Sequence, residues 1–538
     1  MMRGMRRRDA ILAAVGVSLL VLNALAIHKT ELTGTNLIIV AGECRAPATV
    51  IEPPGGKTGR AAILIHGLSA NRRVMRILGE TLAGEDNLRV YLVDLPGHGD
   101  NTDAFSFPHA EECTAAVVER LIRDGAIAPA QTAVVGHSMG GEIAIRLTDY
   151  ASVAATVAIS PAPMILPRRM PSNLLVLSAQ YDFPQLRQQA QVLALSAGGD
   201  RTTAEDFEQL RAFHLQNVAY ANHTSVIIDP TGAEQAASWI EAALDPATLR
   251  RADVAGWSQK VRRGSTDVGW RPKTGLAMTW TVRVAPLLGF IGLLLMFPLA
   301  ARVALRQLGF TRLKSCVCAK ELPGSVVPKP LALLEGAVFA FITVLLLKIE
   351  VPLKFLHLYS GAYLVSLLLI VGSLLLAFNR RAAKDSWIWD ARSLLASSAL
   401  GFVVILAFGA WLNWRLTDVW MNGPRWIRLA GLVPFCFVFI FAEEMVLGPV
   451  GDGKRRIARF VVFALLRVEV WLAAVIAFYV LASGNVLIAV LFPTLAGFSV
   501  LHRLGTDEIR TRTGSAVAAA AFGAILAAWL IAAVFPLT

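Results

Sequence analysis

Two patterns of apolar residues follow one another along the 538-residue chain. Between residues 28 and 245, short apolar runs of strand length alternate with stretches of helical periodicity, such as Arg72–Leu82 and Glu111–Arg123. The strand-like runs lie near Asn36–Val40, Ala61–Ile65, Val90–Asp94, Thr132–Val135, Val153–Ile159, Leu174–Leu177 and Asn217–Tyr220. This alternation predicts a largely parallel sheet that is covered by helices on both faces.

From residue 279 to residue 538 the apolar runs are long enough to cross a lipid bilayer, which takes about 20 residues of helix. Eight such runs lie near 281–302, 331–351, 357–378, 394–414, 428–449, 460–481, 484–501 and 515–535. They predict an all-α, multi-pass transmembrane bundle that follows the α/β domain in the chain.

Two further segments complete the predicted organisation. Residues 1–27 place four arginines before the apolar run Ala10–Ile27, which predicts an uncleaved transmembrane anchor, with a signal peptide as the alternative. Residues 246–278 are rich in Arg and Lys and contain Trp257 and Trp270. They predict a juxtamembrane linker that is either solvated or lies on anionic headgroups.

Composition and charge support the membrane assignment. The chain is 55% hydrophobic and 17% charged, whereas soluble domains carry about 25% charged residues. The segments 1–9, 302–330, 379–392, 451–459 and 502–513 contain 21 Lys and Arg, against 4 in the intervening short loops. The positive-inside rule therefore predicts a plasma (inner) membrane protein with a cytoplasmic N-terminus. The α/β domain and the C-terminus are then extracytoplasmic, and the net charge of +12 reflects topology, not nucleic-acid binding.

A strand-to-helix motif provides the first candidate chemistry. Gly136-His137-Ser138-Met139-Gly140 fits the pattern G-x-S-x-G, in which a sharp turn exposes the serine hydroxyl and the glycines avoid close contacts. A strand is predicted before it and a helix after it. The pattern alone is common, so its weight depends on the rest of the domain.

Four other pieces of residues 36–245 accompany this motif in a fixed order. They are Ile65-His66-Gly67-Leu68, Asp94-Leu95-Pro96-Gly97-His98-Gly99, Leu177-Ser178-Ala179-Gln180-Tyr181-Asp182 and Asn222-His223-Thr224-Ser225. As a set they resemble the α/β-hydrolase superfamily in its lipase- and esterase-like branch, in which nucleophile, acid and histidine follow in this order.

The resemblance implies a role for each matched residue. Ser138 would be the nucleophile, His223 the base, and Asp182 the acid that orients the imidazole. The backbone N–H groups of Leu68 and Met139 would form the oxyanion hole. His66, Gly67, Gly136, His137 and Gly140 would support these motifs, and no metal or other cofactor is expected.

Rival residues exist for two of these roles. His214 could replace His223, but it falls in the helical pattern Phe207–Leu215, and Asp206 could replace Asp182, but it lies in a polar helix. Helices are predicted at 184–197 and 203–216, whereas only about a dozen residues separate Ser160 from Leu174. No large cap fits there, which predicts an open site suited to a polymeric, peptidic or membrane-embedded ester.

Cysteines and intramembrane charges complete the candidate residues. Cys44 and Cys113 could form a disulfide outside the membrane or remain two thiols. Ionisable residues at membrane depth should face the bundle interior and form pairs. They are Glu335, Glu443, Glu444, Arg467 and Glu469, and the favoured pair is Arg467 with Glu443 or Glu444. This pair would be a structural lock, with a transport or proton pathway as the alternative.

The sequence thus predicts a membrane-anchored serine hydrolase that cleaves an ester, lipid-like or otherwise hydrophobic, at the outer face of the membrane. The alternative is a transporter or flippase-like protein whose external domain processes or senses cargo. Substrate identity and oligomeric state cannot be predicted from these patterns.

Overall fold

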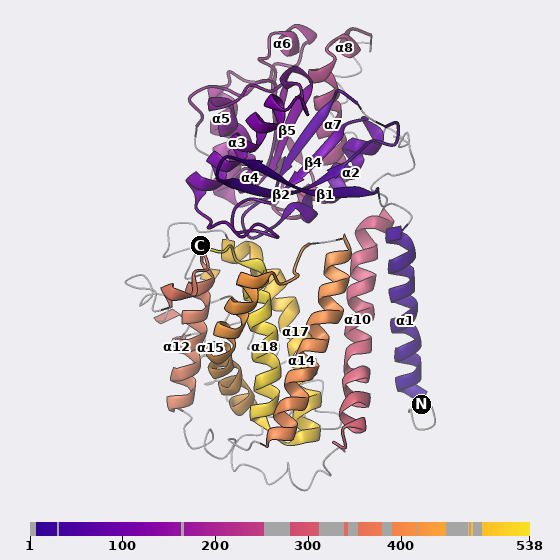
Figure 1. Ribbon diagram of the computed structural model, residues 1–538, viewed down its shortest axis with the longest axis vertical. Helices are drawn as coiled ribbons and strands as arrows, with labels where there is room; N and C mark the ends of the chain where they lie inside the picture. The colour runs from indigo at the N-terminus through magenta and orange to yellow at the C-terminus, as the bar shows by residue number, and fades with distance from the viewer. Residues whose placement is uncertain are drawn as a thin grey trace. The chain divides into compact units, whose positions relative to one another are not determined.

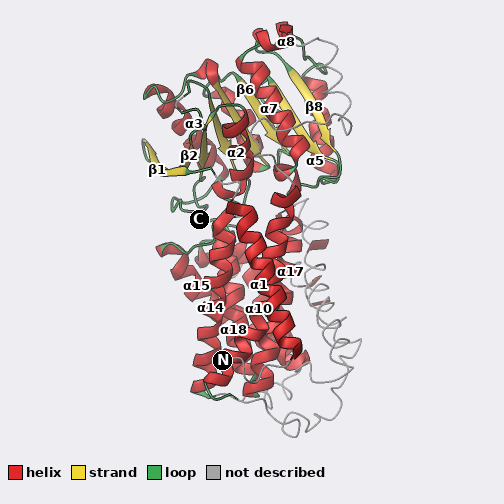
Figure 2. Ribbon diagram, turned by 90° about the vertical axis from the view of Figure 1, so that its right-hand side faces the viewer, coloured by secondary structure: helices red, strands yellow, loops and turns green. Residues whose placement is uncertain are grey.

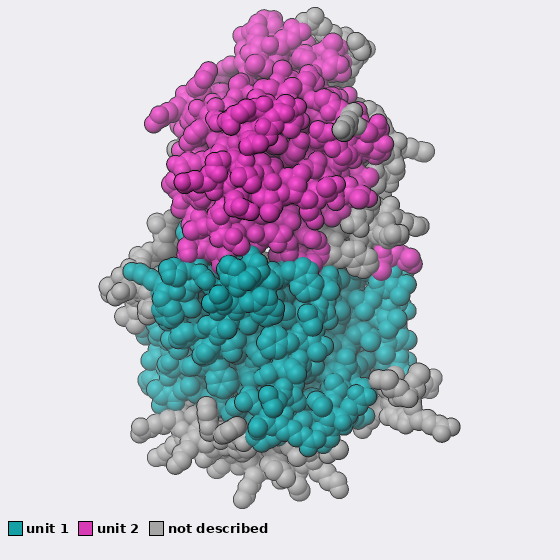
Figure 3. Space-filling view, in the orientation of Figure 1, with its two compact units in different colours: residues 1–23, 288–411, 419–535 teal, residues 24–287, 412–418, 536–538 magenta. Residues whose placement is uncertain are grey.

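The chain forms two compact units (Figure 3). The helical unit comprises residues 1–23, 288–411 and 419–535, and the α/β unit comprises residues 24–287, 412–418 and 536–538. The computed structural model describes residues 7–28, 32–56, 58–162, 166–251, 280–310, 353–378, 390–415, 417–447 and 487–538, besides isolated residues at 338–339, 341–342, 472 and 475–476.

The α/β unit is built on one sheet of eight strands in the order β1-β2-β4-β3-β5-β6-β7-β8 (Figures 1 and 2). The strands are β1 (Gly34–Ala41), β2 (Cys44–Ile51), β3 (Ala61–Ile65), β4 (Arg89–Val93), β5 (Thr132–His137), β6 (Ala155–Ile159), β7 (Leu174–Ala179) and β8 (Phe213–Val218). β1 and β2 form an antiparallel pair, β2 is antiparallel to β4, and all other neighbours are parallel. The predicted, largely parallel sheet is confirmed.

Helices cover both faces of this sheet, as the alternation of buried residues requires. On β7, Leu175 and Leu177 join a core with helices α2 (Arg76–Glu85) and α7 (Pro230–Leu244). The intervening Leu174 and Val176 point to the other face and meet Ile145 of α4 (Met139–Arg146) and Leu193 of α5 (Pro184–Ser196). Successive side chains of a strand point to opposite faces of the sheet, so the apolar residues of β7 are buried in the cores on both faces.

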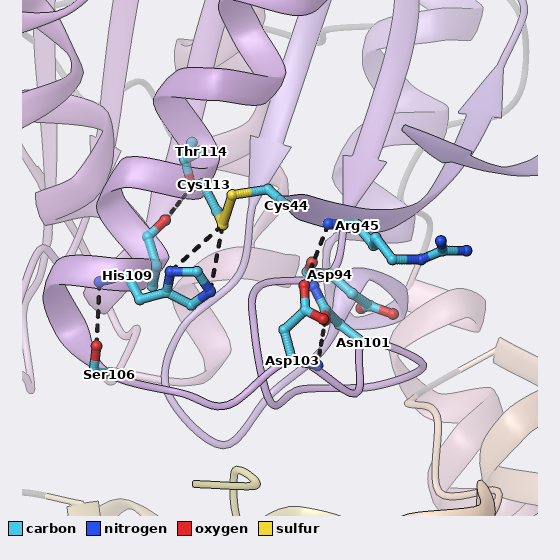
Figure 4. Close-up of a disulfide and its surroundings, with 10 residues drawn as sticks. Cys44, Arg45, Asp94, Asn101, Asp103, Ser106, His109, Cys113 and Thr114 are labelled. Atoms are coloured by element: carbon cyan, nitrogen blue, oxygen red, sulfur yellow. Dashed lines mark hydrogen bonds between the residues drawn. A yellow bond between two sulfur atoms is a disulfide. The ribbon is translucent and has the colours of Figure 1, made fainter. Parts of the chain in front are cut away.

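Helix α3 (Phe107–Arg123) is joined to the antiparallel edge of the sheet by a disulfide between Cys113 and Cys44 of β2 (Figure 4). The side chain of Ser106 caps the first turn of α3 by accepting a hydrogen bond from the backbone N–H of His109. The sequence allowed either a disulfide or two thiols, and the structure shows the disulfide. The two bonded cysteines are 69 residues apart in the sequence.

Two features of the α/β unit differ from the sequence prediction. Strand β2 was not predicted, because its residues Cys-Arg-Ala-Pro-Ala-Thr-Val-Ile include a proline and lack a clear apolar alternation. The helix expected over 203–216 is wrong beyond its first part. Helix α6 covers only Ala204–Glu208, and the chain then enters β8, which pairs in parallel with β7.

The helical unit contains long apolar helices, five of which are long and apolar enough to cross a membrane among the residues described. Its helices are α1 (Arg7–His28), α10 (Trp280–Gln307), α12 (Gly361–Phe378), α14 (Ala391–Arg415), α15 (Gly423–Leu447), α17 (Leu487–Thr513) and α18 (Ala516–Val534). Helix α15 packs against both α12 and α18. The runs predicted near 331–351 and 460–481 lie almost wholly outside the described residues, as does most of the predicted linker at 246–278.

One boundary in the helical unit was predicted wrongly. Residues 502–513 were expected to form a loop because they contain several charges, but they continue α17 to Thr513. Many of these polar side chains are buried, including His502, Arg503 and Glu508. Several of these side chains form ion pairs within the helical unit, such as that of Arg503 with Glu444. The lower hydropathy of residues 502–513 therefore reflects a buried polar cluster and not the end of the helix.

Candidate active site

Ser138 sits at a sharp turn between β5 and α4 in the middle of the sheet. Its backbone φ of +54° and ψ of −120° lie in a region that residues with a side chain rarely adopt. The turn is held because the Ser138 N–H donates to the carbonyl of Ile159 (2.9 Å) on the neighbouring β6. The serine side chain is partly exposed there, whereas His137 before it and Met139 after it are buried.

Close backbone approaches explain why glycines surround Ser138. A Cβ atom on Gly136 would lie 1.9 Å from the carbonyl oxygen of Gly140, and one on Gly140 would lie 2.3 Å from the carbonyl oxygen of Ile65. A Cβ on Gly67 would come within 2.9 Å of the Ser138 Cβ. The loop after β3 therefore passes directly beside the serine.

The structure brings Ser138, His223 and Asp182 into one hydrogen-bonded chain. His223 Nε2 lies 3.0 Å from Ser138 Oγ, and His223 Nδ1 lies 2.9 Å from Asp182 Oδ1. The side chains of His223 and Asp182 are 7% and 1% exposed, so this chain is largely shielded from water. Asp182 follows β7 and His223 lies in the loop after β8, two places where parallel strands end beside Ser138.

The surroundings of Asp182 keep its carboxylate ionised. Burial by itself raises the pKa of Asp182, but the hydrogen bond and attraction of His223 outweigh it, together with a hydrogen bond from the backbone N–H of Phe183. The net effect lowers the pKa of Asp182 below its usual value. A carboxylate in this state can hold Nδ1 of His223 protonated, which leaves Nε2 free to accept the serine proton.

His137 supports the backbone of His223. A carbonyl can only accept a hydrogen bond, so His137 Nε2 carries the proton that it donates to the carbonyl of His223 at 2.8 Å. Burial, together with the nearby His223, lowers the pKa of His137 to about 3, so the ring is neutral. The sequence assigned His137 only a supporting role in the motif, and its contact shows what it supports.

The predicted oxyanion donors, the N–H groups of Leu68 and Met139, come from the loop after β3 and from the start of α4. Met139 is the first residue of α4, and the N–H groups of a first helical turn have no acceptor within the helix. Leu68 follows Gly67, whose contact with Ser138 places the loop at the site. Both residues thus adjoin Ser138 in the chain or in space, and their role as oxyanion donors stays a prediction.

Two buried histidines hold the loop after β3 (residues 66–71), which we call the oxyanion loop after its predicted role. His98 Nδ1 donates to the carbonyl of Pro96 (2.8 Å), which leaves Nε2 to accept the N–H of Ser69 (3.2 Å). His66 Nε2 accepts the N–H of Leu95 at 3.1 Å, and burial lowers its pKa to about 4. Each ring must therefore be neutral in one tautomer to make its contacts, and the bond between His98 and Ser69 was not predicted.

An ion-pair network under the same loop was missed by the sequence analysis. Arg72 is 4% exposed and contacts the fully buried Asp94 through both its backbone N–H (2.7 Å) and its guanidinium. Its other terminal nitrogen lies 2.7 Å from Asp100. Two features of the sequence could have indicated this pair. Arg72 follows shortly after the predicted oxyanion loop, and Asp94 stands at the end of the next strand.

The rival residues lie in other interactions. His214 is on β8, not on a helix as predicted, and its Nδ1 contacts Asp200 at 3.1 Å while its ring stacks on Trp239. Asp206 forms a capping box with Thr203 at the start of α6 and pairs with Arg211. Neither is joined to Ser138 in the way that His223 and Asp182 are.

The charged residues predicted at membrane depth are only partly described. Glu335, Arg467 and Glu469 lie outside the described residues, so the pairing of Arg467 is a prediction still. Glu443 and Glu444 lie on α15 and are buried. Glu444 contacts two arginines of α17 that the sequence analysis did not consider, Arg503 (3.0 Å) and Arg510 (3.5 Å).

Comparison with known proteins shows the family of the chain. A family model described as "Alpha/beta hydrolase family" matches residues 62–475. The chain is 34% identical over 107 residues to a pimeloyl-[acyl-carrier protein] methyl ester esterase of Vibrio cholerae, and 30% identical over 166 residues to that of Vibrio atlanticus. These alignments cover 19% and 28% of the chain, and 38% and 59% of the two relatives. The chain therefore spans less than two thirds of the length of either relative.

Two esterases are among the solved structures to which the chain is similar. A Pyrobaculum calidifontis esterase matches with 17% identity and a TM-score of 0.32, covering 46% of the chain and 95% of that protein. An esterase/lipase from an uncultured bacterium matches with 14% identity and a TM-score of 0.31, covering 45% of the chain and 100% of that protein.

Proposed function

Because the chain belongs to the alpha/beta hydrolase family, we propose that it is a membrane-anchored serine hydrolase that cleaves a hydrophobic ester. The observation that carries this proposal is the continuous contact from Ser138 Oγ through His223 to Asp182. A serine hydroxyl becomes an effective nucleophile only when a base removes its proton, and His223 Nε2 is within hydrogen-bond distance of it.

Acylation is the first half of the proposed reaction. Ser138 Oγ attacks the ester carbonyl carbon while its proton passes to His223 Nε2. Asp182 stabilises the imidazolium that forms, and its lowered pKa keeps it ionised for this purpose. The carbonyl oxygen, now negative, accepts hydrogen bonds from the N–H groups of Leu68 and Met139, each worth about 2.7–4 kcal/mol in the transition state.

Collapse of the tetrahedral intermediate breaks the bond from the carbonyl carbon to the alcohol oxygen. The imidazolium of His223 gives its proton to the departing alcohol, which leaves an acyl group on Ser138. A water molecule then attacks the acyl carbon while His223 again accepts the proton, and the acid is released as Ser138 regains its hydroxyl proton. The neutral rings of His66 and His98 keep the oxyanion loop in place throughout.

We place the α/β unit at the outer face of a plasma (inner) membrane, with the N-terminus in the cytoplasm. Two observations support this placement: the excess of Lys and Arg in the segments expected inside, and the disulfide between Cys44 and Cys113, a bond that persists in oxidising compartments. The five apolar helices support attachment to the membrane. A substrate ester carried in or on the bilayer would suit such a protein.

Hydrolysis of 4-nitrophenyl esters by the full chain in detergent or proteoliposomes tests the proposal. Wild type should release 4-nitrophenol with saturation kinetics, and Ser138→Ala, which removes only one oxygen atom, should lower kcat by about 1,000-fold or more. Ser196→Ala, at the exposed end of α5 away from the motif, is the matched control and should leave kcat within twofold. Equal rates for wild type and Ser138→Ala would contradict the proposal.

A second function, transport or flipping of cargo by the helical unit, is favoured by one observation. Glu444 is fully buried on α15 beside Arg503 and Arg510, and intramembrane charges often line transport pathways. Replacing Glu443 and Glu444 by Gln in proteoliposomes separates the possibilities. Unchanged ester turnover and unchanged lipid scrambling would leave these charges a structural lock, whereas lost scrambling with retained hydrolysis would support transport.

A further inference from the structure

A cavity of about 410 Å³ is lined by Met139, the residue after Ser138, by other residues of α4 and by the start of α3. We propose that this cavity holds the acyl chain of the substrate, and that it favours an uncharged aliphatic chain over one that ends in a carboxylate. This inference rests on the proposed hydrolase function, because it names the substrate class of the same site.

Three residues that line the cavity are attached directly to Ser138. Met139 follows it in the chain, and the backbone N–H groups of Glu142 and Ala162 both donate to the carbonyl of Ser138, at 3.1 and 3.0 Å. The cavity therefore adjoins the backbone of the turn that carries the nucleophile. The volume falls within the range of about 300–1,000 Å³ that small-molecule sites occupy.

One face of α4 supplies the apolar part of the lining. Met139, Glu142, Ile143 and Arg146 recur at helical spacing and all line the cavity. Met139 and Ile143 are 2% and 4% exposed, so their side chains form the inner wall. Burying an aliphatic chain against such a wall is favourable by about 0.8 kcal/mol for each methylene group.

The charged residues that line the cavity are mostly acidic. Glu111, Glu112 and Glu142 contribute three carboxylates, and Arg146 contributes one guanidinium. Arg146 Nε is already 2.7 Å from Glu111 Oε2, so this cation is engaged. A carboxylate at the end of an acyl chain would enter a field with an excess of two negative charges, whereas a methyl end would not.

Chain-length preference tests the aliphatic part of the proposal. The measurement is kcat/KM of the full-length protein for 4-nitrophenyl acetate, butyrate and octanoate. Ile143→Phe should lower the octanoate-to-acetate ratio at least fivefold, and Ile143→Ala should raise it. Ile145→Ala is the matched control, because Ile145 lies on the same helix but packs in the sheet core. It should leave the ratio unchanged even if it lowers the melting temperature.

Terminal charge tests the electrostatic part. Wild type should hydrolyse the mono-4-nitrophenyl ester of adipic acid, which ends in a carboxylate, at least tenfold less efficiently than 4-nitrophenyl hexanoate. Glu112→Lys should reduce this discrimination to threefold or less. Glu119→Lys makes the same charge change on α3 away from the cavity and should preserve the discrimination.

The outcomes separate this inference from the proposed function. If no ester is hydrolysed faster by wild type than by Ser138→Ala, the hydrolase proposal itself fails. If hydrolysis depends on Ser138 but the Ile143 variants change all three chain lengths equally, the acyl chain binds elsewhere. If Glu112→Lys and Glu119→Lys reduce the discrimination equally, the effect comes from net charge and the cavity assignment is wrong.

Discussion

Mild acid should destabilise the α/β unit through two buried neutral histidines. Burial lowers the pKa of His66 to about 4 and that of His137 to about 3, against 6.5 in an unfolded chain. As the pH falls below 6.5, the unfolded chain binds two protons that the folded chain does not. The free energy of unfolding therefore decreases with falling pH in the window from about 6.5 down to the folded pKa values.

The size of the effect follows from these pKa values. Between pH 7 and pH 5 each histidine removes about 1.9 kcal/mol of stability, so the pair removes about 4 kcal/mol. The lowered pKa of Asp182 keeps it ionised at pH 5, so it contributes little in this window, whereas burial raises the pKa of Asp94 and thereby offsets part of the loss as the pH falls. The predicted loss is a large fraction of the 5–15 kcal/mol, roughly, that holds a typical domain folded.

Hydrogen–deuterium exchange of the full-length protein in detergent provides the assay. The most protected amides of β3 and β5, corrected for the pH dependence of intrinsic exchange, report the free energy of opening the unit. That free energy should fall by as much as about 4 kcal/mol between pH 7 and pH 5, the contribution of the two histidines. His66→Asn should halve the pH dependence even though it lowers stability at pH 7. A wild-type change below about 1 kcal/mol would refute the reasoning, because it would mean that these rings titrate normally.

Three other predictions follow from particular contacts. Cys44→Ser should lower the free energy of unfolding by about 4 kcal/mol, since the bond to Cys113 closes a loop of 69 residues, and denaturant unfolding of reduced wild type should match the variant. His98→Phe removes the acceptor of the Ser69 N–H, so it should lower kcat about tenfold and leave KM within twofold. A change in KM alone would argue against a role of His98 in the oxyanion loop. Glu444→Gln should destabilise the helical unit by about 3–5 kcal/mol, because Arg503 and Arg510 lose their carboxylate partner. The measurement is the melting temperature in detergent, which should fall. An unchanged melting temperature would contradict this prediction.

Local patterns predicted the sheet and the strand-to-helix turn because their causes are local. The parallel strands β3 to β7 are continuous apolar runs, buried on both faces, and such runs stand out from their neighbours. The turn at Ser138 needs glycines at fixed offsets, so Gly136 and Gly140 are visible in the sequence. Their reason, contacts of about 2 Å to a facing backbone, is visible only in three dimensions.

The predictions that failed depend on contacts between distant residues. Residues 209–216 have helical periodicity, yet Phe213–Val218 becomes a strand because the edge of β7 offers it hydrogen bonds. The charges at 502–512 suggest a loop, but partners such as Glu444, about 60 residues earlier, allow them to remain in a buried helix. The support of the oxyanion loop by His98 and Arg72 likewise depends on side chains 20 to 30 residues apart.

Covalent labelling of Ser138 tests the central claim most directly. A fluorophosphonate reacts with a serine only when a neighbouring base activates it, and peptide mass spectrometry identifies the modified residue. We predict stoichiometric labelling of the full-length protein on the peptide that contains Ser138, with labelling slowed at least 100-fold in His223→Gln. Absence of adduct on folded wild-type protein, or an equal labelling rate in His223→Gln, would contradict the assignment of Ser138 as an activated nucleophile.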